Sequence, residues 1–337
     1  MAKKINVGLI GVGRLGKIYL GHLKYSVPEA NLVAIADVEH GVAESLAKEY
    51  DVPKWYEKSE DLIADKDIEA VVIITPTKTH SEVVIEAAKA GKAIFCEKPI
   101  SLSLEEAENM VEVTEKAGAF FQMGFMRRFD KGYMAAKEKI DNGLIGKPVV
   151  LKSSSRDPYR TSLEFANPKN SGGMIMDMGA HDFDIARWFM GEVKSVFSIT
   201  GTLAYPELNT VGDIDNAIVS LSFENETLGV VDLSRNGVYG YDIRTEILGT
   251  EGTLKIGYLR ETPLLIMKKE GITHDTVPYF MERFGDAYLT QLKDFIDNLL
   301  NDKPPAITGK DAIATLKIGI AATLSQKQAT QVEIKSI

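Results

Sequence analysis

The stretch INVGLIGVGRLG, residues 5–16, decides the fold of this chain. Its first six residues are an apolar run that indicates a buried strand, and a turn with glycines at positions 11, 13 and 16 follows at once. A helical pattern continues over residues 17–24, and a second apolar run over residues 31–36 ends in Asp37. Strand, glycine turn, helix, strand and then an acid about 20 residues past the turn form the pattern of a dinucleotide-binding βαβ unit.

Each glycine of the turn has its own task in such a unit. Gly11 permits the tight turn, Gly13 lets the backbone approach a pyrophosphate, and Gly16 lets the helix pack closely on the strand. The start of the helix then offers unpaired N–H groups and a positive dipole to the phosphates. We therefore expect the cofactor to be bound by the whole turn, Gly11, Gly13, Arg14, Leu15 and Gly16, rather than read it as a chance glycine turn.

Asp37 refines the choice of cofactor. A carboxylate at the tip of the second strand accepts hydrogen bonds from the ribose hydroxyls of NAD, and its charge opposes the 2′-phosphate of NADP. The next three residues, Val38, Glu39 and His40, include no Arg or Lys that could hold such a phosphate. The sequence therefore predicts NAD, against the alternative of a solvated acid at a strand end.

The composition narrows the class of protein. The 337 residues suffice for two domains, and 45% hydrophobic and 26% charged residues are ordinary for a globular protein. A net charge of −9 argues against nucleic acid and anionic membrane surfaces as partners. The single cysteine, Cys96, excludes an intrachain disulfide framework. We see no apolar run of membrane-spanning length and no room for a signal peptide before the first strand, so we expect a cytoplasmic protein.

The first part of the chain alternates strand-like and helix-like segments. Further strands are predicted over residues 68–75, 93–96 and 119–125, and helices over 42–50, 59–64, 81–90 and from 103 onward. Alternation of this kind predicts a parallel, doubly wound sheet of the Rossmann type.

The pattern changes near Met126. Strand-like segments dominate from there on, over residues 149–155, 193–200, 217–223, 229–236, 244–248, 253–256 and 264–268. Helices are predicted over residues 131–142, 177–190, 287–300 and 311–325. Successive strands with short turns predict an α+β domain on a largely antiparallel open sheet. We expect a nucleotide-binding domain over residues 1–124 and a substrate-binding and oligomerisation domain over residues 125–337.

Two segments follow predicted parallel strands, at the edge where open α/β sheets bind ligands. The first runs from Thr75 and Pro76 to His80 and is expected to border the nicotinamide ribose, although a plain loop with a helix cap is an equal interpretation of any one residue. The second is Glu97-Lys98-Pro99, whose charged pair could reach cofactor and substrate. On spacing alone, a solvated surface pair is the commoner interpretation.

A third segment surrounds His181. Asp177, His181 and Asp184 are spaced to fall on one face of a helix, where a histidine between carboxylates can serve as a general acid or base. A metal site is the rival interpretation, and it ranks lower because hydride transfer to NAD needs no metal. Asp177 could also simply cap the helix.

Taken in order and spacing, the glycine turn, Glu97-Lys98-Pro99 and Asp177-x-x-x-His181 resemble the Gfo/Idh/MocA oxidoreductase family over essentially the whole chain. Other segments are similar to its inositol 2-dehydrogenase branch, namely residues 124–130, 155–158, 176–178, 181–184 and 239–242.

The resemblance implies roles for individual residues. Lys98 would hydrogen-bond the reacting hydroxyl, His181 would take its proton, and Asp177 would position the substrate and support His181. By the same resemblance, the polyol pocket would be lined by Met126, Arg127, Asp157 and Asp184, with Tyr239 or Tyr241 in addition.

The resemblance thus implies NAD-dependent oxidation of myo- or scyllo-inositol to the inosose by a homotetramer. One alternative is a dehydrogenase of an aldose or deoxy sugar on the same frame. Another is a non-catalytic, nucleotide-sensing regulator, which need not keep an intact lysine and histidine pair; this chain has both.

Overall fold

Six parallel strands form the first sheet of the computed structural model, which describes residues 3–337. Their spatial order is β3-β2-β1-β4-β5-β6. The strands are β1 (Ile5–Ile10), β2 (Ala30–Ala36), β3 (Lys54–Tyr56), β4 (Ala70–Ile73), β5 (Ala93–Glu97) and β6 (Phe121–Gly124). The order reverses between β1 and β4, so the predicted doubly wound sheet is confirmed, with the short edge strand β3 as an addition.

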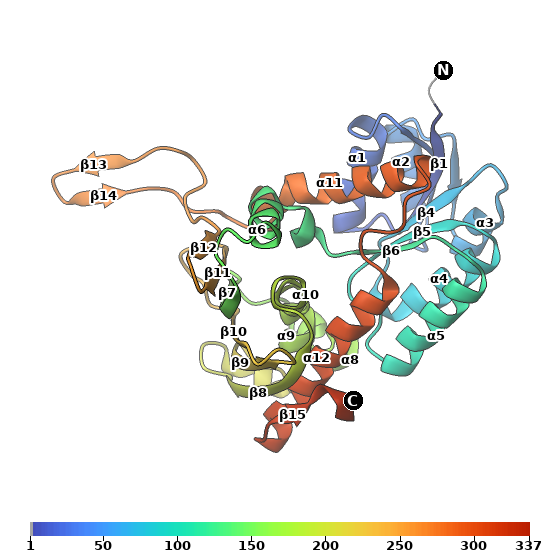
Figure 1. Ribbon diagram of the computed structural model, residues 1–337. Helices are drawn as coiled ribbons and strands as arrows, with labels where there is room; N and C mark the ends of the chain where they lie inside the picture. The colour runs from blue at the N-terminus through green and yellow to red at the C-terminus, as the bar shows by residue number, and fades with distance from the viewer. Residues whose placement is uncertain (1–2) are drawn as a thin grey trace. The chain divides into compact units, whose positions relative to one another are not determined.

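Helices follow most of these strands (Figure 1). They are α1 (Arg14–Tyr25), α2 (Val42–Glu49), α3 (Ser59–Ala64), α4 (His80–Lys89) after the short 3-10 helix η1 (Thr77–Thr79), and α5 (Leu104–Lys116). Helix α5 is capped by Ser103, whose hydroxyl accepts the backbone N–H of Glu106. At the end of α4, Gly91 takes a positive φ of 73°, as a helix-ending glycine does.

The chain divides into two compact units. The first unit holds the residues up to Met126 together with residues 286–314, and the second unit holds residues 127–285 and 315–337. Helices α11 (Phe280–Leu300) and α12 (Gly309–Gln328) each begin in one unit and end in the other. The predicted domain boundary at 124/125 lies close to the point after Met126 where the chain passes from the first unit to the second. The prediction placed residues 286–314 in the second domain, whereas the structure groups them with the first unit. Met1 and Ala2, where the expectation about a signal peptide begins, lie outside the described residues.

Inside the first unit, α11 covers the face of the sheet on which α1 lies. Phe295 of α11 packs on Phe95 of β5 with ring centroids 5.7 Å apart, and Tyr288 packs edge-on against Tyr19 of α1 at 6.0 Å. Backbone bonds add to this contact, since the N–H of Met123 in β6 donates to Ile307 O at 3.0 Å. The segment after residue 286 is thus part of the core of this unit.

A seven-stranded sheet forms the second unit, in the order β12-β11-β7-β10-β9-β8-β15. The strands are β7 (Pro148–Arg156), β8 (Val193–Gly201), β9 (Asn216–Phe223), β10 (Leu228–Ser234), β11 (Asp242–Gly249), β12 (Thr253–Ile256) and β15 (Val332–Glu333). Every neighbouring pair is antiparallel except β7 with β10, which confirms the largely antiparallel sheet. Helix α10 (Gly179–Met190) packs on one face of this sheet, against β7 and β10.

Shorter elements complete the second unit. They are η2 (Met126–Phe129), which starts at the crossing, α6 (Lys131–Asp141), α7 (Leu163–Ala166), α8 (Pro168–Ser171), α9 (Met174–Asp177), η3 (Pro206–Thr210) and η4 (Ile334–Ser336). The prediction of one helix over 177–190 is wrong in detail, because Met178 separates α9 from α10.

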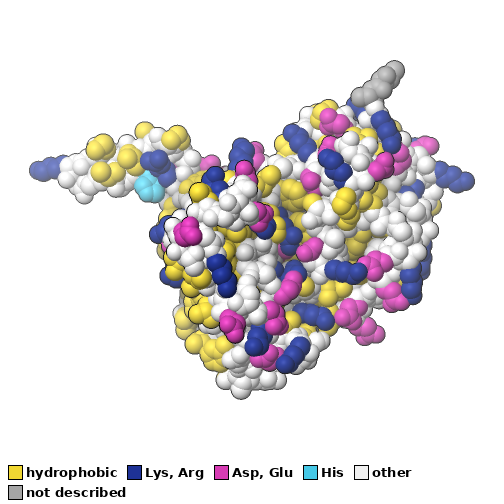
Figure 2. Space-filling view, viewed as in Figure 1, with side chains coloured by type: hydrophobic (Ala, Val, Ile, Leu, Met, Phe, Trp, Pro, Cys, Tyr) yellow, Lys and Arg dark blue, Asp and Glu magenta, His cyan; other side chains and the backbone are white. Residues whose placement is uncertain are grey.

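One predicted strand of the main sheet lies elsewhere. Residues 264–268 do not join the seven-stranded sheet; β13 (Ile266–Lys268) pairs only with β14 (Gly271–Thr273), in a hairpin that extends away from the sheet (Figure 1). Hydrophobic side chains form patches on the projecting hairpin (Figure 2), and Met267 and Ile272 of its strands and Leu264 just before it are all exposed. The apolar run identified a strand that the structure places at residues 266–268, but it could not specify the partner.

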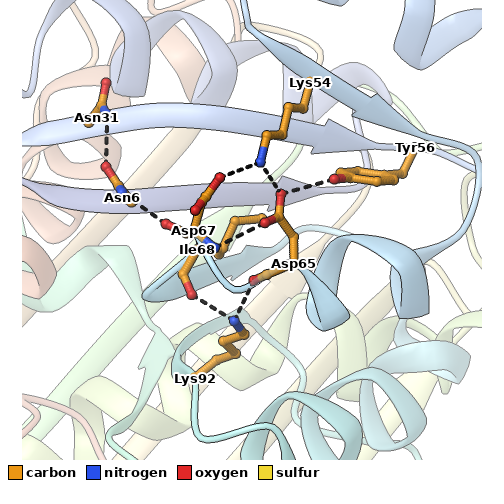
Figure 3. A network of polar contacts seen from close by, with 8 residues as sticks. All are labelled: Asn6, Asn31, Lys54, Tyr56, Asp65, Asp67, Ile68 and Lys92. Atoms are coloured by element: carbon orange, nitrogen blue, oxygen red, sulfur yellow. Dashed lines mark hydrogen bonds and ion pairs between the residues drawn. The ribbon is translucent and has the colours of Figure 1, made fainter.

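A polar network ties together the starts of the strands in the first unit (Figure 3). Asp65, in the loop after α3, accepts hydrogen bonds from Lys54 at 2.7 Å and from the Tyr56 hydroxyl at 2.9 Å. Lys92, just before β5, donates to the carbonyl oxygens of Asp65 and Ile68, both at 2.7 Å. Asp65 and Lys92, which precede β4 and β5, lie at the amino-terminal edge of the sheet, opposite the edge where open α/β sheets bind ligands.

Candidate active site

The glycine turn between β1 and α1 cannot accept side chains at two of its positions. Gly11 has a φ of +89°, and a Cβ on it would lie 2.7 Å from the carbonyl oxygen of Ile74. A Cβ on Gly16 would lie 2.1 Å from the carbonyl oxygen of Gly11, which is an impossible contact. The turn therefore requires glycine at both positions, as the fingerprint predicts.

Gly13 differs, because no atom lies within 4 Å of where its Cβ would be. It is the N-cap of α1, no side chain caps the helix there, and the first turn of the helix contains no acidic residue. The start of α1 thus has open space beside Gly13 and no side-chain cap, at the favourable end of the helix dipole. This arrangement fits the pyrophosphate of a dinucleotide. Arg14 and Leu15 follow on the same turn, Arg14 exposed and Leu15 half-buried.

Asp37 is held in place directly beside this turn. One carboxylate oxygen accepts the backbone N–H of Val12 at 2.8 Å, and the other accepts the N–H of Glu39 at 2.9 Å. These bonds fix the carboxylate at the end of β2, next to the glycine turn. The placement fits a ribose contact, which itself stays a prediction.

Hydrogen bonds between its own residues stabilise the loop after β4. The Thr79 hydroxyl lies 2.9 Å from both the Thr75 hydroxyl oxygen and the Pro76 carbonyl oxygen. Thr75 is half-buried and Pro76 is exposed, so both remain available for the predicted cofactor contacts. His80 is only 1% exposed, and its ring nitrogens lie within hydrogen-bonding distance of Pro99 O and Thr75 O. Both ring nitrogens are thus engaged by the protein backbone, and the predicted cofactor contact of His80 stays a prediction.

Glu97 and Lys98 have different environments at the end of β5. Glu97 is buried, and its carboxylate accepts the Tyr19 hydroxyl and the Gln291 side-chain N–H. Burial raises the pKa of Glu97, while the bond from Tyr19 opposes the rise. The Glu97 carboxylate is thus engaged within the core, and the predicted cofactor contact of this residue stays a prediction. Lys98 is half-buried at the carboxyl edge of the sheet, and its peptide bond to Pro99 is cis.

In the second unit, Asp177 and His181 lie on either side of the break between α9 and α10. Asp177 ends α9 and forms an ion pair with Arg235 at 3.4 Å, and Arg235 is fully buried. Asp213 lies near this pair and accepts the backbone N–H of Met174 at 2.9 Å. Burial raises the pKa of Asp213. His181 lies in the first turn of α10 and is 8% exposed.

Two predicted pocket residues take part in buried ion pairs. Arg127 donates to Asp182 at 2.9 Å and to the Ser155 hydroxyl at 3.1 Å. Burial alone would lower the pKa of Arg127, but Asp182 beside it raises the pKa overall. Asp184 accepts two hydrogen bonds from Arg128, at 2.9 and 2.6 Å. The structure thus gives both residues a role in packing α10 within the second unit, and their contact with substrate stays a prediction.

The remaining predicted pocket residues differ in exposure. Tyr239 is 42% exposed and donates its hydroxyl to Asp242 at 2.7 Å. Tyr241 is 6% exposed, and the charges of Arg127 and Asp157 act on its hydroxyl; burial raises its pKa well above the ordinary value. The structure thus associates Tyr241, rather than Tyr239, with two other predicted pocket residues. Met126 is buried and is the last residue of its segment of the first unit.

The sequence did not show which residues pair with the predicted site residues. Tyr19 and Gln291 contact Glu97, Arg235 contacts Asp177, and the partners of Arg127 and Asp184 are Asp182 and Arg128. Within residues 3–337, the one grouping of side chains with metal-ligand spacing is Glu60, Glu82 and Glu86, and it contains none of the predicted site residues. In the same range, no helix combines the length and apolarity needed to cross a membrane.

Comparison with known proteins gives matches over nearly the whole chain. Residues 5–125 match the model of the Gfo/Idh/MocA oxidoreductase family described as its NAD-binding Rossmann fold, and residues 137–334 match the model of its C-terminal alpha/beta domain. Scyllo-inositol 2-dehydrogenase (NAD(+)) of Bacillus subtilis (strain 168) is 41% identical over 335 residues, covering 99% of this chain and 97% of that protein.

Two further relatives agree with this. Myo-inositol 2-dehydrogenase of Thermotoga maritima is also 41% identical over 335 residues, covering 99% of both chains. The crystal structure of scyllo-inositol dehydrogenase from Lactobacillus casei, with bound NAD(H) and scyllo-inositol, superposes with a TM-score of 0.94 at 34% identity, covering 99% of this chain and 100% of that one.

Proposed function

Because the chain belongs to the Gfo/Idh/MocA oxidoreductase family, we propose that it oxidises an inositol, scyllo- or myo-inositol, to the corresponding inosose with NAD as the hydride acceptor. The observation that carries this proposal is similarity at 41% identity over 99% of the chain to two relatives named as inositol 2-dehydrogenases. The glycine turn and the fixed carboxylate of Asp37 support the choice of cofactor.

The chain's own residues hold the cofactor in this proposal. The N–H groups at the start of α1 bind the pyrophosphate, and Gly13 keeps the approach clear of side chains. Asp37 accepts hydrogen bonds from the adenosine ribose. Thr75 and Pro76 border the nicotinamide half at the carboxyl edge of the sheet. NAD bound in this way supplies the acceptor for a hydride.

Three side chains act on the substrate alcohol. A ring nitrogen of His181 accepts the hydroxyl proton as the carbon–hydrogen bond releases its electron pair as hydride and the C=O bond forms. Lys98 donates a hydrogen bond to the same oxygen and stabilises the negative charge that develops on it. Asp177, held by Arg235, orients the substrate and supports His181 in its charged form. The net result is one ketone, one proton and one reduced cofactor.

The test is a panel of polyols and sugars with the purified protein. NADH formation is followed by absorbance with NAD and, separately, myo-inositol, scyllo-inositol, glucose and xylose. We expect the highest kcat/KM with one of the two inositols. A preference for glucose or xylose would replace the proposal by the sugar dehydrogenase alternative. NAD binding without turnover of any of the four would favour the regulator.

We also propose that the protein acts as a homotetramer in the cytoplasm. The outer face of the seven-stranded sheet carries exposed apolar residues that the strand register aligns on one side, among them Ile199, Ile218 and Leu248. Exposed apolar side chains on a sheet face favour association. The cytoplasmic location rests on the absence of disulfides from a chain with one buried cysteine. Light scattering should give four times the chain mass of 37.0 kDa, and a monomer would contradict the assembly.

A further inference from the structure

His80 is a buried titratable group that the proposed mechanism does not use. It is the first residue of α4, where the chain leaves the loop after β4, and it is 1% exposed. Its Nδ1 lies 2.8 Å from the carbonyl oxygen of Pro99, and its Nε2 lies 2.9 Å from the carbonyl oxygen of Thr75. One imidazole thus spans two loops that follow neighbouring parallel strands, β4 and β5.

Both partners of the ring are hydrogen-bond acceptors. A neutral imidazole has one N–H and can donate to only one carbonyl at a time, whereas the imidazolium donates to both. Burial lowers the pKa of His80, and the two carbonyl bonds oppose that lowering. In either protonation state the ring therefore donates a hydrogen bond to at least one of the two loops.

The two loops carry residues that matter to the proposed reaction. Thr75 begins the loop assigned to the nicotinamide half of the cofactor, and Pro99 directly follows Lys98. On the other side of Lys98, the Glu97 carboxylate accepts the backbone N–H of Lys98 at 3.1 Å. The backbone of Lys98 is therefore fixed on one side by Glu97 and on the other through Pro99 and His80.

We propose that His80 is a positioning residue, whose imidazole ties the Thr75 loop to the Lys98-Pro99 turn and thereby sets where the Lys98 ammonium stands. The inference rests on the proposed function in its assignment of Lys98 to the reacting oxygen. Each of the two bonds has its own consequence. The bond to Pro99 governs Lys98 and so kcat, and the bond to Thr75 governs the cofactor loop and so KM for NAD.

Three substitutions separate the two bonds. In His80→Asn the side-chain amide nitrogen stands where Nδ1 stood and can keep the bond to Pro99. In His80→Gln the amide nitrogen reaches the place of Nε2 and can keep the bond to Thr75. His80→Leu fills the space and keeps neither. His274→Leu, at an exposed histidine of the second unit, serves as the matched control.

The first measurement is amide hydrogen exchange in the intact protein. Exchange of residues 98–103 should accelerate in His80→Leu and His80→Gln but not in His80→Asn. Exchange of residues 75–79 should accelerate in His80→Leu and His80→Asn but not in His80→Gln. A variant that merely loosened the core would accelerate both segments alike, so equal effects of Asn and Gln on both segments overturn the proposal.

The second measurement is steady-state kinetics with inositol and NAD. Misplacement of a catalytic group by about 1 Å costs on the order of 10²-fold, so kcat should fall by about 10- to 100-fold in His80→Leu and His80→Gln. His80→Asn should retain kcat to within about threefold and instead raise KM for NAD. Unchanged kcat and unchanged exchange in a folded His80→Leu protein would overturn the inference. If the wild type oxidises no inositol, the proposed function fails, yet the exchange patterns still decide for or against His80.

Discussion

At the scale of single residues, the end of β5 carries two neighbouring charged residues in different environments, the buried Glu97 and the half-buried Lys98. Alternate residues of a strand point to opposite faces, so Glu97 lies on the same face as Phe95, and both contact Tyr19. Glu97 thus points into the core, where Gln291 provides a further donor. Lys98 lies just beyond the strand, at the sheet edge, on a backbone that Glu97 and His80 restrain. A buried carboxylate therefore helps to fix the backbone of Lys98, the proposed catalytic cation.

Removal of that cation tests the role of Lys98. Lys98→Met keeps the approximate volume and removes the charge that stabilises the developing alkoxide, so turnover with inositol and NAD should fall by about 10²–10³-fold. Lys98→Arg should rescue poorly, because a planar fork does not replace a compact ammonium at one oxygen. Thermal unfolding of both variants should match the wild type. Near-normal turnover of Lys98→Met would contradict the proposed role of Lys98 and leave Glu97-Lys98-Pro99 with a structural role only.

A second substitution tests the proton path. His181→Ala should cut turnover by about 10²–10⁴-fold, the usual range for loss of a general base. The affinity for NADH, measured by fluorescence titration, should change by less than about twofold, because the proposed nucleotide site lies in the first unit. A folded His181→Ala protein that keeps most of its turnover would remove His181 from this role.

A third substitution concerns the choice of cofactor. The Asp37 carboxylate is fixed by Val12 and Glu39 N–H groups, so it cannot swing away from a 2′-phosphate. Asp37→Ala should raise the ratio of kcat/KM with NADP to that with NAD by at least about tenfold, since one removed charge repulsion of about 1.4 kcal/mol corresponds to that factor. Glu39→Ala, which changes an exposed neighbouring acid, is the control. A wild type that already prefers NADP would contradict the assignment.

The site residues that the sequence could predict are those whose chemistry is local. The glycines at 11, 13 and 16 and the acid at 37 are set by the geometry of one βαβ unit. The structure places the glycines in the turn between β1 and α1 and Asp37 beside that turn. Tyr19 and Gln291 could not be found in this way, because their hydrogen bond joins residues 272 positions apart. For the same reason the sequence did not predict that Arg127 pairs with Asp182, 55 positions away.

At the scale of elements, the amino-terminal edge of the first sheet is held by charge. Asp65, whose side chain is nearly buried, accepts bonds from Lys54, Tyr56 and the backbone N–H of Asp67. The bond from Lys54 is the main cause that lowers the pKa of Asp65 from 3.8 to about 2. A carboxylate whose pKa is depressed by folding stabilises the folded state above its unfolded pKa. This contribution is lost as the pH falls from about 4 towards 2.

Asp65→Asn should therefore lower the free energy of unfolding at pH 7 by about 1–3 kcal/mol, the range for hydrogen bonds to a charged group. The difference from wild type should shrink as the pH falls through the window from about 4 to 2, because the wild-type carboxylate is then protonated too. Denaturant unfolding at a series of pH values measures both. Asp67→Asn, at a side chain that also contacts Lys54 but is 70% exposed, should cost less than about 1 kcal/mol. A pH-independent difference would contradict the assignment to the Asp65 charge.

Periodicity recovered most elements because hydrophobic patterns are set by the face that each element buries. It missed β3, whose three residues are too short for a pattern and pair with β2 only at the sheet edge. It also joined α9 to α10, because Met178 keeps helical backbone angles and only the hydrogen bonding changes there. Strand 264–268 was found, but its pairing with β14 alone depends on a neighbour that periodicity does not specify.

At the scale of the whole molecule, the first unit is built from two distant stretches of chain. Residues 286–314 supply Phe295 against Phe95, Tyr288 against Tyr19, and a backbone acceptor for β6 at Ile307. The sequence pattern did not indicate that residues 286–314 belong to the first unit, because the hydrophobic pattern of a helix does not depend on which sheet the helix covers. The unit that carries the glycine turn is therefore not the first 126 residues alone.

A fragment experiment tests this directly. Residues 1–126 alone should fail to fold cooperatively, because the apolar surface of Phe95 and Tyr19, fully buried in the whole chain, would be exposed. The same fragment joined through a flexible glycine-serine linker to residues 286–314 should unfold in one transition and bind NADH. Phe295→Ala in the linked protein should lower its stability by about 3–5 kcal/mol, the usual cost of truncating a buried phenylalanine. Circular dichroism melts and NADH fluorescence measure these outcomes. Cooperative folding of residues 1–126 by themselves would contradict the prediction, because it would show that residues 286–314 cover the sheet but are not required for it to fold.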